Sequence, residues 1–588
     1  MKISRFNIAF IIAVVTVGAI YSLPHMIREH ELSKQGTQYF AWTQEASFDM
    51  FNVHAARYRG ILDGDGLLSY DDTLEHQGGP TLWPFLSVAI FAPFLWLTKS
   101  VSATVVITDA LFPMLLFGGF FLLFSRLLAN RYAALFSSLV LMLFPQLPHL
   151  LPPSSLWEFK QIISPLYDLT YLRREAFIPS GVFFILCIHF AHQILTKRER
   201  RYTVLAGVFY GLLFYFYFYF WSYATVVLGL LFVAMLFCKH KDAALRILGA
   251  IVLGLFVSIP FWLNQYELMS LPQYQELIER GGLEVGRSFR FGLWKTYILY
   301  AGMACLVVWL GRRTKQTRAA ILVAALLAAN IVVLNAQLVA GFNIQSDHWS
   351  TRVFLITVGV SWAAILRFLY QYTEGRLHRF KRAIAVLGIV IPVVLAGNMV
   401  RLEFELEPAR AEQYTVGQNL LDAYAWMDKT LPRGSVVATP SLGTNIDVPV
   451  FTHHKLFMPR SQTSIASEQE IIERMLITYK LFGVKPQTLA ELLATPEGVV
   501  YFFTARYEDT ALDKYLNPTE YESFAIPYGL WERILLQYQE YSLADGFAYQ
   551  LDYLFVGPRE RALGVTEESF AQYELMYDAG GVRVYQYE

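Results

Sequence analysis

Long apolar runs, separated by short polar segments, dominate the chain up to about residue 400. A helix needs about 20 predominantly apolar residues to cross a hydrocarbon core of ~30 Å. The pattern therefore predicts about eleven membrane-spanning helices. The predicted spans are Phe6–Leu23, Val101–Phe124, Tyr132–Leu151, Phe177–Leu195, Tyr202–Phe220, Tyr223–Phe237, Ile247–Leu263, Tyr297–Leu310, Ala319–Val339, Val353–Tyr370 and Ile384–Val400.

One further apolar segment, Thr81–Leu97, decides the topology. Short cytoplasmic loops are enriched in Lys and Arg. If this segment crossed the bilayer, two basic loops would fall outside, whereas an interrupted helix at the outer surface places all basic loops inside. We therefore predict a surface helix, a cytoplasmic N-terminus and an extracytoplasmic position for everything after Val400. The basic positions are Lys2, Arg5, Arg126, Arg131, Lys197–Arg201, Lys239–Lys241, Arg312–Lys315 and Arg376–Arg382.

The first apolar run has a second interpretation, as a cleaved signal peptide. Such a peptide ends in a small-x-small cleavage site. The sequence VGAIYSLP at the end of the run contains no clear site of this kind. We therefore expect a retained span and an integral protein of the plasma (inner) membrane.

Beyond Val400 the pattern changes to that of a soluble domain, with helical periodicity alternating with short strand-like runs. This part contains no Gly-rich phosphate loop, GxSxG elbow or HExxH motif, so we expect it to bind or support an acceptor. The predicted helices are NLLDAYAWMDKTL, EQEIIERMLITYKLF and LWERILLQYQEY, and the predicted strands are GSVVATP, GVVYFFTAR, DYLFVGP and VRVYQYE.

The fold class follows from these two patterns. We predict a polytopic α-helical membrane domain over residues 1–400, whose first extracytoplasmic loop covers about residues 24–100. A soluble extracytoplasmic α/β domain over residues 401–588 follows it.

Composition agrees with a membrane protein. Hydrophobic residues make up 55% of the 588 residues and charged residues 16%, whereas a soluble domain is roughly 45–50% apolar. Lys and Arg together number 48, as do Asp and Glu, so no basic field is available to hold nucleic acid. Cys187, Cys238 and Cys305 all fall in apolar runs, which gives no sign of a disulfide framework or a cysteine metal site.

Three polar segments share the predicted outer side. The first loop contains FDMFNVHAARYRGILDGDGLLSYDD (Phe48–Asp72), with five aspartates, and the others are Leu151–Phe177 and Gly341–Phe354. The last carries His348 and Arg352 at the mouth of a span. Carboxylates are ligands for hard cations, and a guanidinium forms a fork that fits phosphate. Their convergence predicts a site for a metal and a lipid phosphate.

Several stretches occur in an order that is typical of one family. FDMFNVHAARY and the later SYDD look like its first acidic motif, GGPTLWPFL like the surface helix that follows, and PLYDLTYL stands in the place of its second acidic motif. FYFYFYFWSYATVVLGLL looks like its aromatic spans, RVFLITVGVSWAAIL like its Arg-led late span, and AYAWMDKTLPRGSVVATPS like the start of its soluble part. Over nearly its whole length the chain thus resembles the GT-C superfamily of membrane glycosyltransferases, most closely the catalytic subunit of oligosaccharyltransferases.

The resemblance implies a role for three residues. Asp49 matches the catalytic Asp of the first loop, which helps to hold a divalent metal (Mn or Mg) and orients the acceptor. Asp168 matches the Asp of the second acidic motif, a metal ligand, and Arg352 matches the Arg that contacts the phosphate of the lipid-linked donor. Transfer from a polyprenyl phosphate indeed needs stabilisation of the leaving group and a carboxylate that positions the acceptor.

The chain departs from the family in two places. The acidic residue expected two positions after Asp168 is Thr170, so Glu158 or Glu175 would have to supply that ligand. The Trp-Trp-Asp-Tyr-Gly motif that recognises the acceptor sequon is replaced by PSLGTNIDVP. The resemblance therefore implies a transferase that moves a sugar or glycan from a polyprenyl-phosphate or diphosphate donor to a protein or glycan acceptor other than that sequon.

Each candidate residue also has a purely structural interpretation. Asp49 could cap a helix, Asp168 could pair with a neighbouring arginine, and Arg352 could anchor a span at the interface. His348 could contact the acceptor or simply be a hydrogen-bonded loop histidine. The aromatic run Tyr215–Trp221 is better explained by helix packing and an interfacial belt than by sugar binding.

Two other functions remain open. A transporter or flippase of lipid-linked saccharides would also need many spans, but should show inverted repeats or helices broken near the middle of the membrane, and no internal symmetry is found. A catalytically inactive scaffold would keep the fold while losing carboxylates, as Thr170 illustrates.

Overall fold

The structure is a computed structural model that describes residues 4–42, 54–65, 73–75, 78–143, 177–345, 348–373, 381–507 and 526–587. The chain divides into two compact units. The helical unit comprises Met1–Glu31, Val105–Trp262 and Val285–Ala409. The α/β unit comprises Leu32–Thr104, Leu263–Glu284 and Arg410–Glu588.

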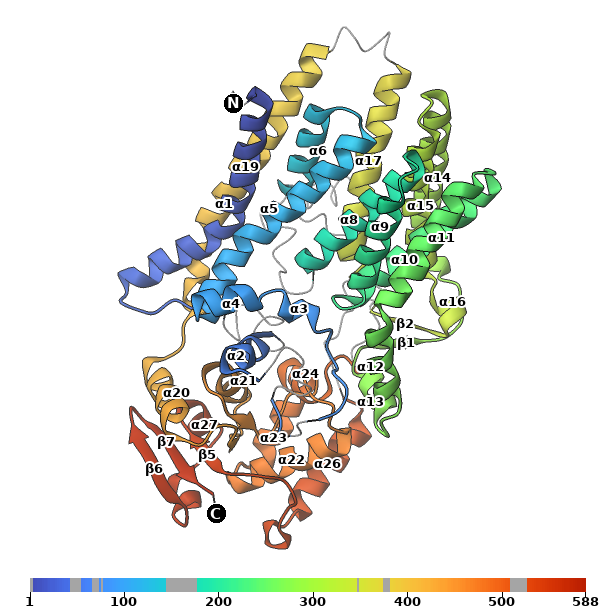
Figure 1. The fold of residues 1–588 in the computed structure, drawn as a ribbon. Coiled ribbons are helices and arrows are strands. Elements are labelled where there is room, and N and C mark those ends of the chain that lie inside the picture. Colours follow the sequence, from blue (N-terminus) through green and yellow to red (C-terminus); the bar gives the residue numbers. More distant parts are fainter. Residues whose placement is uncertain are drawn as a thin grey trace. The chain divides into compact units, whose positions relative to one another are not determined.

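Long apolar helices build the helical unit, and they confirm the predicted polytopic α-helical membrane domain (Figure 1). Among the described residues, eight helices are long and apolar enough to cross a membrane, or nine if one bent pair counts as a single span. The helices are α1 (Arg5–Lys34), α5 (Val101–Leu127), α6 (Arg131–Leu143), α8 (Phe177–Thr196), α9 (Arg200–Leu213), α10 (Phe218–Phe237), α11 (Lys241–Val257), α12 (Ile259–Met269), α14 (Trp294–Arg313), α15 (Thr317–Leu334), α17 (Phe354–Tyr372) and α19 (Lys381–Arg410).

Two predicted spans, Tyr202–Phe220 and Ile247–Leu263, are interrupted. Helix α9 ends at Leu213 instead of continuing to Phe220, and α10 begins at Phe218. With 14 residues, α9 is about 21 Å long, shorter than a ~30 Å hydrocarbon core. Helices α11 and α12 are separated at Ser258 by a bend of 53°. The bend immediately precedes Pro260, whose ring cannot continue a regular helix.

Glycines bring α9 and α11 close together. A Cβ atom on Gly207 would lie 2.8 Å from the carbonyl oxygen of Ala250, and one on Gly211 would lie 2.7 Å from that of Gly254. Both separations are shorter than Cβ contacts in real proteins, so only glycine fits there. Small residues at i and i+4 let the backbones of two transmembrane helices pack closely. The close packing of α9 on α11 fixes the position of the turn that follows α9.

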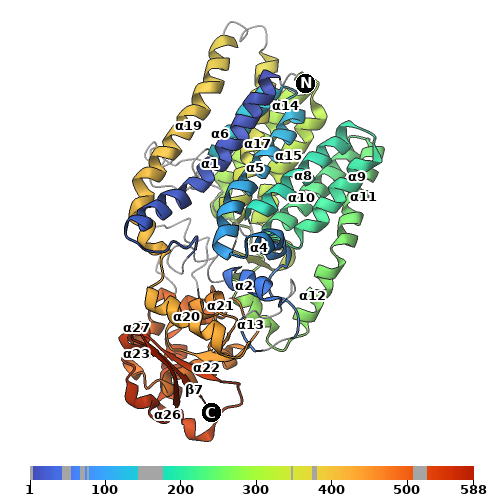
Figure 2. The ribbon, with the colours of Figure 1, turned by 60° about the vertical axis from the view of Figure 1, so that its left-hand side comes forward.

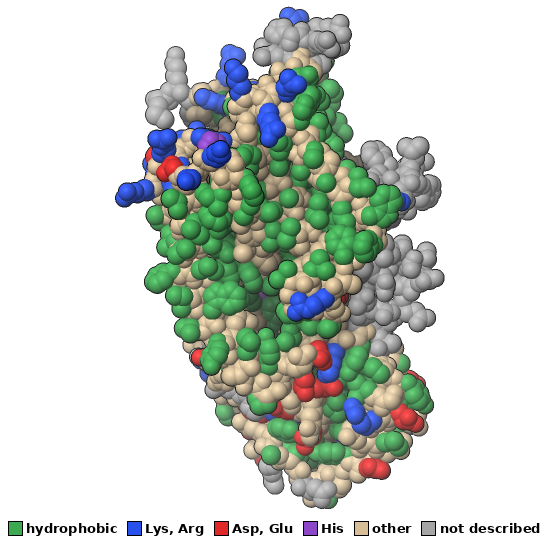
Figure 3. Space-filling view, turned by 90° about the vertical axis from the view of Figure 1, so that its right-hand side faces the viewer, with side chains coloured by type: hydrophobic (Ala, Val, Ile, Leu, Met, Phe, Trp, Pro, Cys, Tyr) green, Lys and Arg blue, Asp and Glu red, His purple; other side chains and the backbone are tan. Residues whose placement is uncertain are grey.

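The basic turns of the helical unit lie at one end. Arg318, at the α14–α15 turn, donates to the carbonyl oxygen of Leu195 at 2.8 Å, and Arg246, beside the α10–α11 turn, donates to that of Lys197. Arg367, late in α17, donates to the carbonyl oxygen of Leu128 at 2.9 Å. Figure 3 shows Lys and Arg side chains gathered at this end and hydrophobic side chains covering the face beyond it. The described basic turns therefore lie together as predicted, while residues 376–380 of the predicted group fall outside the described residues.

A five-stranded sheet forms the centre of the α/β unit, which confirms the predicted α/β class of the C-terminal part (Figures 1 and 2). The strand order is β4-β3-β5-β7-β6, with β3 parallel to β4 and β5, and β7 antiparallel to β5 and β6. The strands are β3 (Val436–Ala438), β4 (Lys455–Leu456), β5 (Tyr553–Val556), β6 (Glu574–Ala579) and β7 (Val582–Gln586).

The central strands β3 and β5 are buried on both faces of the sheet. Val436 and Leu554 point into one apolar core, while their neighbours Val437 and Phe555 point into another. This alternation is the period of two expected of strands covered on both sides. Helix α22 (Glu468–Leu481) packs in the first core and α20 (Gln418–Thr430) in the second. The other helices are α21 (Leu442–Phe451), α23 (Pro486–Leu493), α24 (Pro496–Phe503), α26 (Tyr528–Glu540) and α27 (Pro558–Ala562).

One predicted strand is wrong, because GVVYFF of the stretch GVVYFFTAR belongs to helix α24, which ends at Phe503. The Thr495 side chain caps the helix by accepting a hydrogen bond from the Gly498 amide at 3.1 Å. Pro496 follows at the first helical position and Glu497 lies in the first turn. These start signals outweigh the strand propensity of the β-branched and aromatic residues that come next.

Much of the first loop belongs to the α/β unit. Leu74 is fully buried in the core that contains α22, and the Leu456 amide donates to the Thr73 carbonyl oxygen at 2.7 Å. Glu75 pairs with Arg474, whose side chain is completely buried. The segment Thr81–Leu97 contains two short helices, α3 (Leu86–Ala89) and α4 (Ala92–Thr98), as predicted for an interrupted helix. Helix α2 (Ala56–Asp63) precedes them.

Candidate functional site

The predicted site residues divide into two groups. Arg352 and His348 are described and lie in the helical unit. The predicted carboxylates Asp49, Asp168, Glu158 and Glu175 all lie outside the described residues, as does Thr170.

Arg352 and His348 lie in the connection that leads into α17. Strand β2 (Phe342–Ile344) precedes it, and Trp349–Val353 form a π-helical turn that runs directly into the helix. Such turns often occur at functional sites. His348 and Arg352 are four residues apart and their side chains meet. Trp349 between them is 2% exposed and packs its ring against Tyr219 at 5.1 Å between centroids.

Tyr217 joins these two residues to form a hydrogen-bonded triad. Arg352 donates to the Tyr217 hydroxyl oxygen through Nη1 and to His348 Nε2 through Nη2, the latter at 3.1 Å. A guanidinium has no acceptor, so Nε2 must accept and His348 carries its proton on Nδ1. Nδ1 lies 3.1 Å from the Tyr217 oxygen and donates to it. The Tyr217 oxygen thus accepts two hydrogen bonds that hold the arginine and the imidazole in place.

Aromatic packing fixes Tyr217. The chain turns between α9 and α10, and Tyr217 adopts an extended conformation immediately before α10. Its ring lies 4.9 Å from that of Tyr219, which in turn contacts the His348 ring at 4.9 Å. Tyr219, in the first turn of α10, donates to the Ile344 carbonyl oxygen at 3.1 Å, which joins the start of α10 to β2. The aromatic run is therefore helix packing, as predicted, but Tyr217 also contributes a hydroxyl to the site.

The triad lies at the end of the helical unit opposite the basic turns. Tyr217 and Arg352 precede the N-terminal ends of α10 and α17. At its C-terminal end α10 leads into a basic turn, and the connection that follows α17 lies outside the described residues. The N-terminus of a helix carries partial positive charge, and the Arg352 guanidinium adds a full charge beside that of α17. Together they favour an anion. A guanidinium has five N–H donors, so it can bind a phosphate while keeping its bonds to the protein.

The segment that carries Asp49 is flanked on both sides by anchored residues of the α/β unit. Before it, the Phe40 amide donates to the Tyr414 carbonyl oxygen at 3.0 Å, and the Ala41 amide donates to Ser102 Oγ at 2.9 Å. After it, Arg59 of α2 forms a two-pronged pair with Asp428, at 2.8 and 2.9 Å. The loop therefore starts and ends at fixed points.

The two described aspartates of this loop are paired. Asp63 accepts from Arg59 at 2.8 Å and Asp65 pairs with Arg433 at 2.5 Å. Sequence reasoning treated both residues as solvating charges. The partner of Asp65 lies 368 positions away, whereas the partner of Asp63 lies four positions away on the same helix. Among the described residues, no group of three or more His, Cys, Asp or Glu side chains is arranged to hold a metal ion.

Buried ion pairs in the helical unit also escaped sequence reasoning. His25 Nε2 lies 2.7 Å from an oxygen of Asp109, and Arg28 pairs with Glu407. All four side chains are at most 7% exposed, and the pairs join α1 to α5 and α19. The sequence offers one signal for this pair, because Asp109 is the single acidic residue inside the apolar run VITDALF. An ionisable group inside an apolar span requires a partner.

Comparisons with known proteins show a similarity of structure. No protein-family model matches the sequence, and no curated protein matches it. Among solved structures, the chain is similar to the crystal structure of ArnT from Cupriavidus metallidurans bound to undecaprenyl phosphate, with a TM-score of 0.45 and 13% sequence identity. The alignment covers 96% of this chain and 97% of ArnT.

Proposed function

We propose that this integral membrane protein is a GT-C-type glycosyltransferase. It transfers a sugar or glycan from a polyprenyl-phosphate or diphosphate donor to an extracytoplasmic acceptor. The observation that carries the proposal is the Arg352 triad, in which Tyr217 and His348 orient a guanidinium at the end of the helical unit opposite the basic turns. A lipid donor in the outer leaflet would present its phosphate at that end.

In this proposal Arg352 binds the donor phosphate and Asp49 positions and activates the acceptor nucleophile. Loss of the leaving group places negative charge on the phosphate oxygens, and the Arg352 guanidinium stabilises that charge. A carboxylate accepts the proton of the attacking hydroxyl or amide. Asp49 and Asp168, with Glu158 or Glu175 in place of Thr170, would hold a Mn or Mg ion, which supplies further charge stabilisation when bound.

The proposal fixes an orientation. The basic turns face the cytoplasm together with the N-terminus, and the α/β unit lies on the extracytoplasmic side of the plasma (inner) membrane. The acceptor, a protein or a glycan, approaches from that side. The α/β unit then contributes acceptor binding, not a reaction of its own.

The test is transfer by the purified protein in detergent. The protein is incubated with a panel of polyprenyl-phosphate sugars and candidate acceptors, with and without Mn or Mg, and products are detected by mass spectrometry. We expect a glycosylated acceptor, released polyprenyl phosphate and a dependence on the metal. A flippase needs a bilayer to act, so transfer in detergent separates the two functions. If protein that is shown to be folded by its cooperative unfolding transfers no sugar from any donor, the proposal is contradicted.

A further inference from the structure

Where α14 begins, the helical unit exposes a set of aromatic and aliphatic side chains. The segment Val285–Leu293 leads into the helix, and α16 (Gln337–Ala340) and β2 lie beside it (Figure 1). The exposed fractions of these side chains range from 38% to 86%. We call them the α14 entry surface, and its members are Val285, Phe289, Phe291, Trp294, Val339 and Phe342.

Hydrogen bonds fix the backbone that carries this surface. The Gly286 amide donates to the Gly341 carbonyl oxygen at 2.9 Å, and the Gln337 side chain donates to the Ser288 carbonyl oxygen at 2.9 Å. The apolar side chains are therefore exposed on a segment that is tied to its neighbours. An exposed apolar patch of this kind marks a contact with a membrane or with another protein.

Arg287 lies at the edge of the α14 entry surface. It is exposed, and its Nη1 donates to the carbonyl oxygens of Leu338 and Val339, at 3.2 and 2.8 Å. Gly341 makes room for the guanidinium, because a Cβ atom there would lie 3.0 Å from Nη2. A guanidinium has five N–H donors, and its bonds to the described residues use only Nη1. Nε and Nη2 are therefore available for a two-pronged contact with a phosphate.

Lys295, in the first turn of α14, supplies a second exposed cation. Its Nζ lies 5.9 Å from the centre of the Trp294 ring. The stretch from Val285 to Ser346, between Glu284 and Asp347, contains no Asp or Glu, so the segments that build this surface have no carboxylate of their own. A cation beside the positive end of a helix is unfavourable by itself, and a bound anion would stabilise both.

The location of these two cations is also unusual for a membrane protein. Helix α14 ends in Arg312 and Arg313, in one of the basic turns, so Arg287 and Lys295 lie at its opposite end. Lys and Arg near membrane spans are normally concentrated at the cytoplasmic end. Cations at the other end, next to exposed Trp and Phe side chains, have the composition of a surface that contacts lipid headgroups.

We propose that the α14 entry surface binds an anionic phospholipid. Arg287 and Lys295 hold the lipid phosphate, while the aromatic and aliphatic side chains lie along the glycerol backbone and the upper acyl chains. Aromatic side chains at headgroup level and cations that face anionic lipid both favour this arrangement. A zwitterionic phospholipid would keep the apolar contact but lose most of the electrostatic attraction. The surface therefore prefers anionic to zwitterionic phospholipids.

Photolabelling in vesicles tests this preference without donor or acceptor. The full-length protein is reconstituted in phosphatidylcholine vesicles that contain a trace of photoreactive phosphatidylglycerol or, separately, of photoreactive phosphatidylcholine. Labelled peptides are identified by mass spectrometry. We expect phosphatidylglycerol to label residues 285–295 at least about tenfold more than phosphatidylcholine does, since each cation near anionic lipid contributes about fivefold. Protein that transfers no sugar should show the same preference, so this proposal and the proposed function can fail separately.

An exposed apolar part of α19 is the matched control surface. Ile389 and Val393 are 68% and 65% exposed, and they lie in the apolar run IAVLGIVIPVVLAG, which carries no charge. Both photoreactive lipids should label these residues equally. An equal ratio of the two lipids at both surfaces, or no labelling of residues 285–295 by either lipid, would overturn the proposal.

Variants assign the preference to the two cations. Lys295→Gln should reduce the excess of phosphatidylglycerol labelling about fivefold, and Arg287→Lys should reduce it less, because the charge remains while the fork is lost. The combined Arg287→Gln and Lys295→Gln variant should abolish the excess. Arg401→Gln, on α19, is the control and should be labelled as the wild type is, because that exposed arginine already pairs with Glu405 at 2.7 Å. Lys295→Gln keeps the test valid if the combined variant fails to fold, and an excess that it leaves unchanged would overturn the proposal.

Discussion

Arg352 and Tyr217 are 135 residues apart in the sequence, yet the arginine donates a hydrogen bond to the tyrosine hydroxyl at the end of the helical unit. The arginine precedes α17 and the tyrosine precedes α10, so the bond joins two helices through residues that stand just outside them. His348 bonds to both partners. The proposed donor site is therefore built by two connections, with the spans as its scaffold.

The Tyr217 hydroxyl is expected to orient Arg352 for donor binding. Tyr217→Phe keeps the ring and its packing but removes the acceptor shared by Arg352 and His348. We expect the donor KM to rise about tenfold, since a hydrogen bond to a charged group contributes about 1.5 kcal/mol or more. Steady-state kinetics over a range of donor concentrations measures this. Tyr215→Phe is the control, because that hydroxyl bonds the Val257 carbonyl oxygen at 2.7 Å instead. An equal effect of both variants would show that the tyrosines act through packing.

The geometry of the Arg352 guanidinium should matter as well as its charge. Lysine at this position keeps a positive charge but cannot form a fork on a phosphate. We expect Arg352→Lys to lower kcat/KM for the donor by about tenfold, with a smaller change in the acceptor KM. Arg367→Lys is the matched control at the other end of α17, where the side chain donates to the Leu128 carbonyl oxygen. A wild-type value of kcat/KM for Arg352→Lys would rule out a bidentate contact.

Cysteine labelling tests the proposed orientation. In a background where Cys187, Cys238 and Cys305 are replaced by Ala, single cysteines are placed at exposed positions. Tyr528, on α26 of the α/β unit, is 72% exposed, and His240 lies in the basic α10–α11 turn. A membrane-impermeant maleimide should label Tyr528→Cys in intact cells and His240→Cys only after permeabilisation. The reverse pattern would refute the orientation.

The stability of the protein should fall below neutral pH through His54 in the α/β unit. Burial, and to a lesser degree the Arg57 charge, lowers the pKa of His54 from 6.5 to about 3. The unfolded chain therefore binds a proton that the folded chain does not. The contribution of neutral His54 is fully present above pH 6.5 and is lost as the pH falls towards 3, by about 1.4 kcal/mol per pH unit.

The variant His54→Leu isolates this contribution. Melting temperatures of wild type and variant are measured between neutral and mildly acidic pH. We expect the wild type to lose stability more steeply than the variant as the pH falls. His240→Leu, at an exposed turn, is the control. Parallel curves for wild type and His54→Leu would contradict the burial of a neutral ring.

Hydropathy predicts the spans well where a helix is uniformly apolar. Phe177–Leu195 and Val353–Tyr370 were predicted, and α8 and α17 occupy Phe177–Thr196 and Phe354–Tyr372. It misses the turn after Leu213, because the residues that make the turn are as apolar as the helix and contain neither Gly nor Pro. Tyr217 is missed for the same reason, because in the sequence it looks like one more aromatic residue of a packing run.

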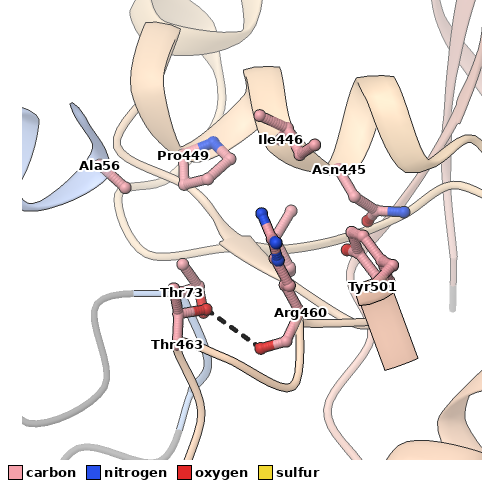
Figure 4. A pocket seen from close by; sticks show the side chains of 9 residues that line it. Ala56, Thr73, Asn445, Ile446, Pro449, Arg460, Thr463 and Tyr501 are labelled. Carbon is pink, nitrogen blue, oxygen red and sulfur yellow. Dashed lines mark hydrogen bonds between the residues drawn. The ribbon is translucent and has the colours of Figure 1, made fainter. Parts of the chain in front are cut away.

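Contacts between distant segments could not be predicted from the sequence. Arg460 and Asn445 carry no motif, and the small pocket that they line in the α/β unit forms only where α21 meets residues of the first loop (Figure 4). Arg59 and Asp428 are 369 residues apart, and nothing local to either residue indicates the other. The grouping of the described basic turns could be predicted, because Lys and Arg counting depends on the composition of short loops and needs no knowledge of tertiary contacts.

Asp49 is proposed to activate the acceptor, and a comparison with another aspartate of the same loop tests this role. Transfer rates of Asp49→Asn and Asp65→Asn are measured side by side, at equal amounts of folded protein. Asp65 forms an exposed pair with Arg433, which contributes about 1 kcal/mol at most, so its loss should leave the rate nearly unchanged. We predict that Asp49→Asn lowers the rate about a hundredfold or more. Equal rates for the two variants would contradict the account.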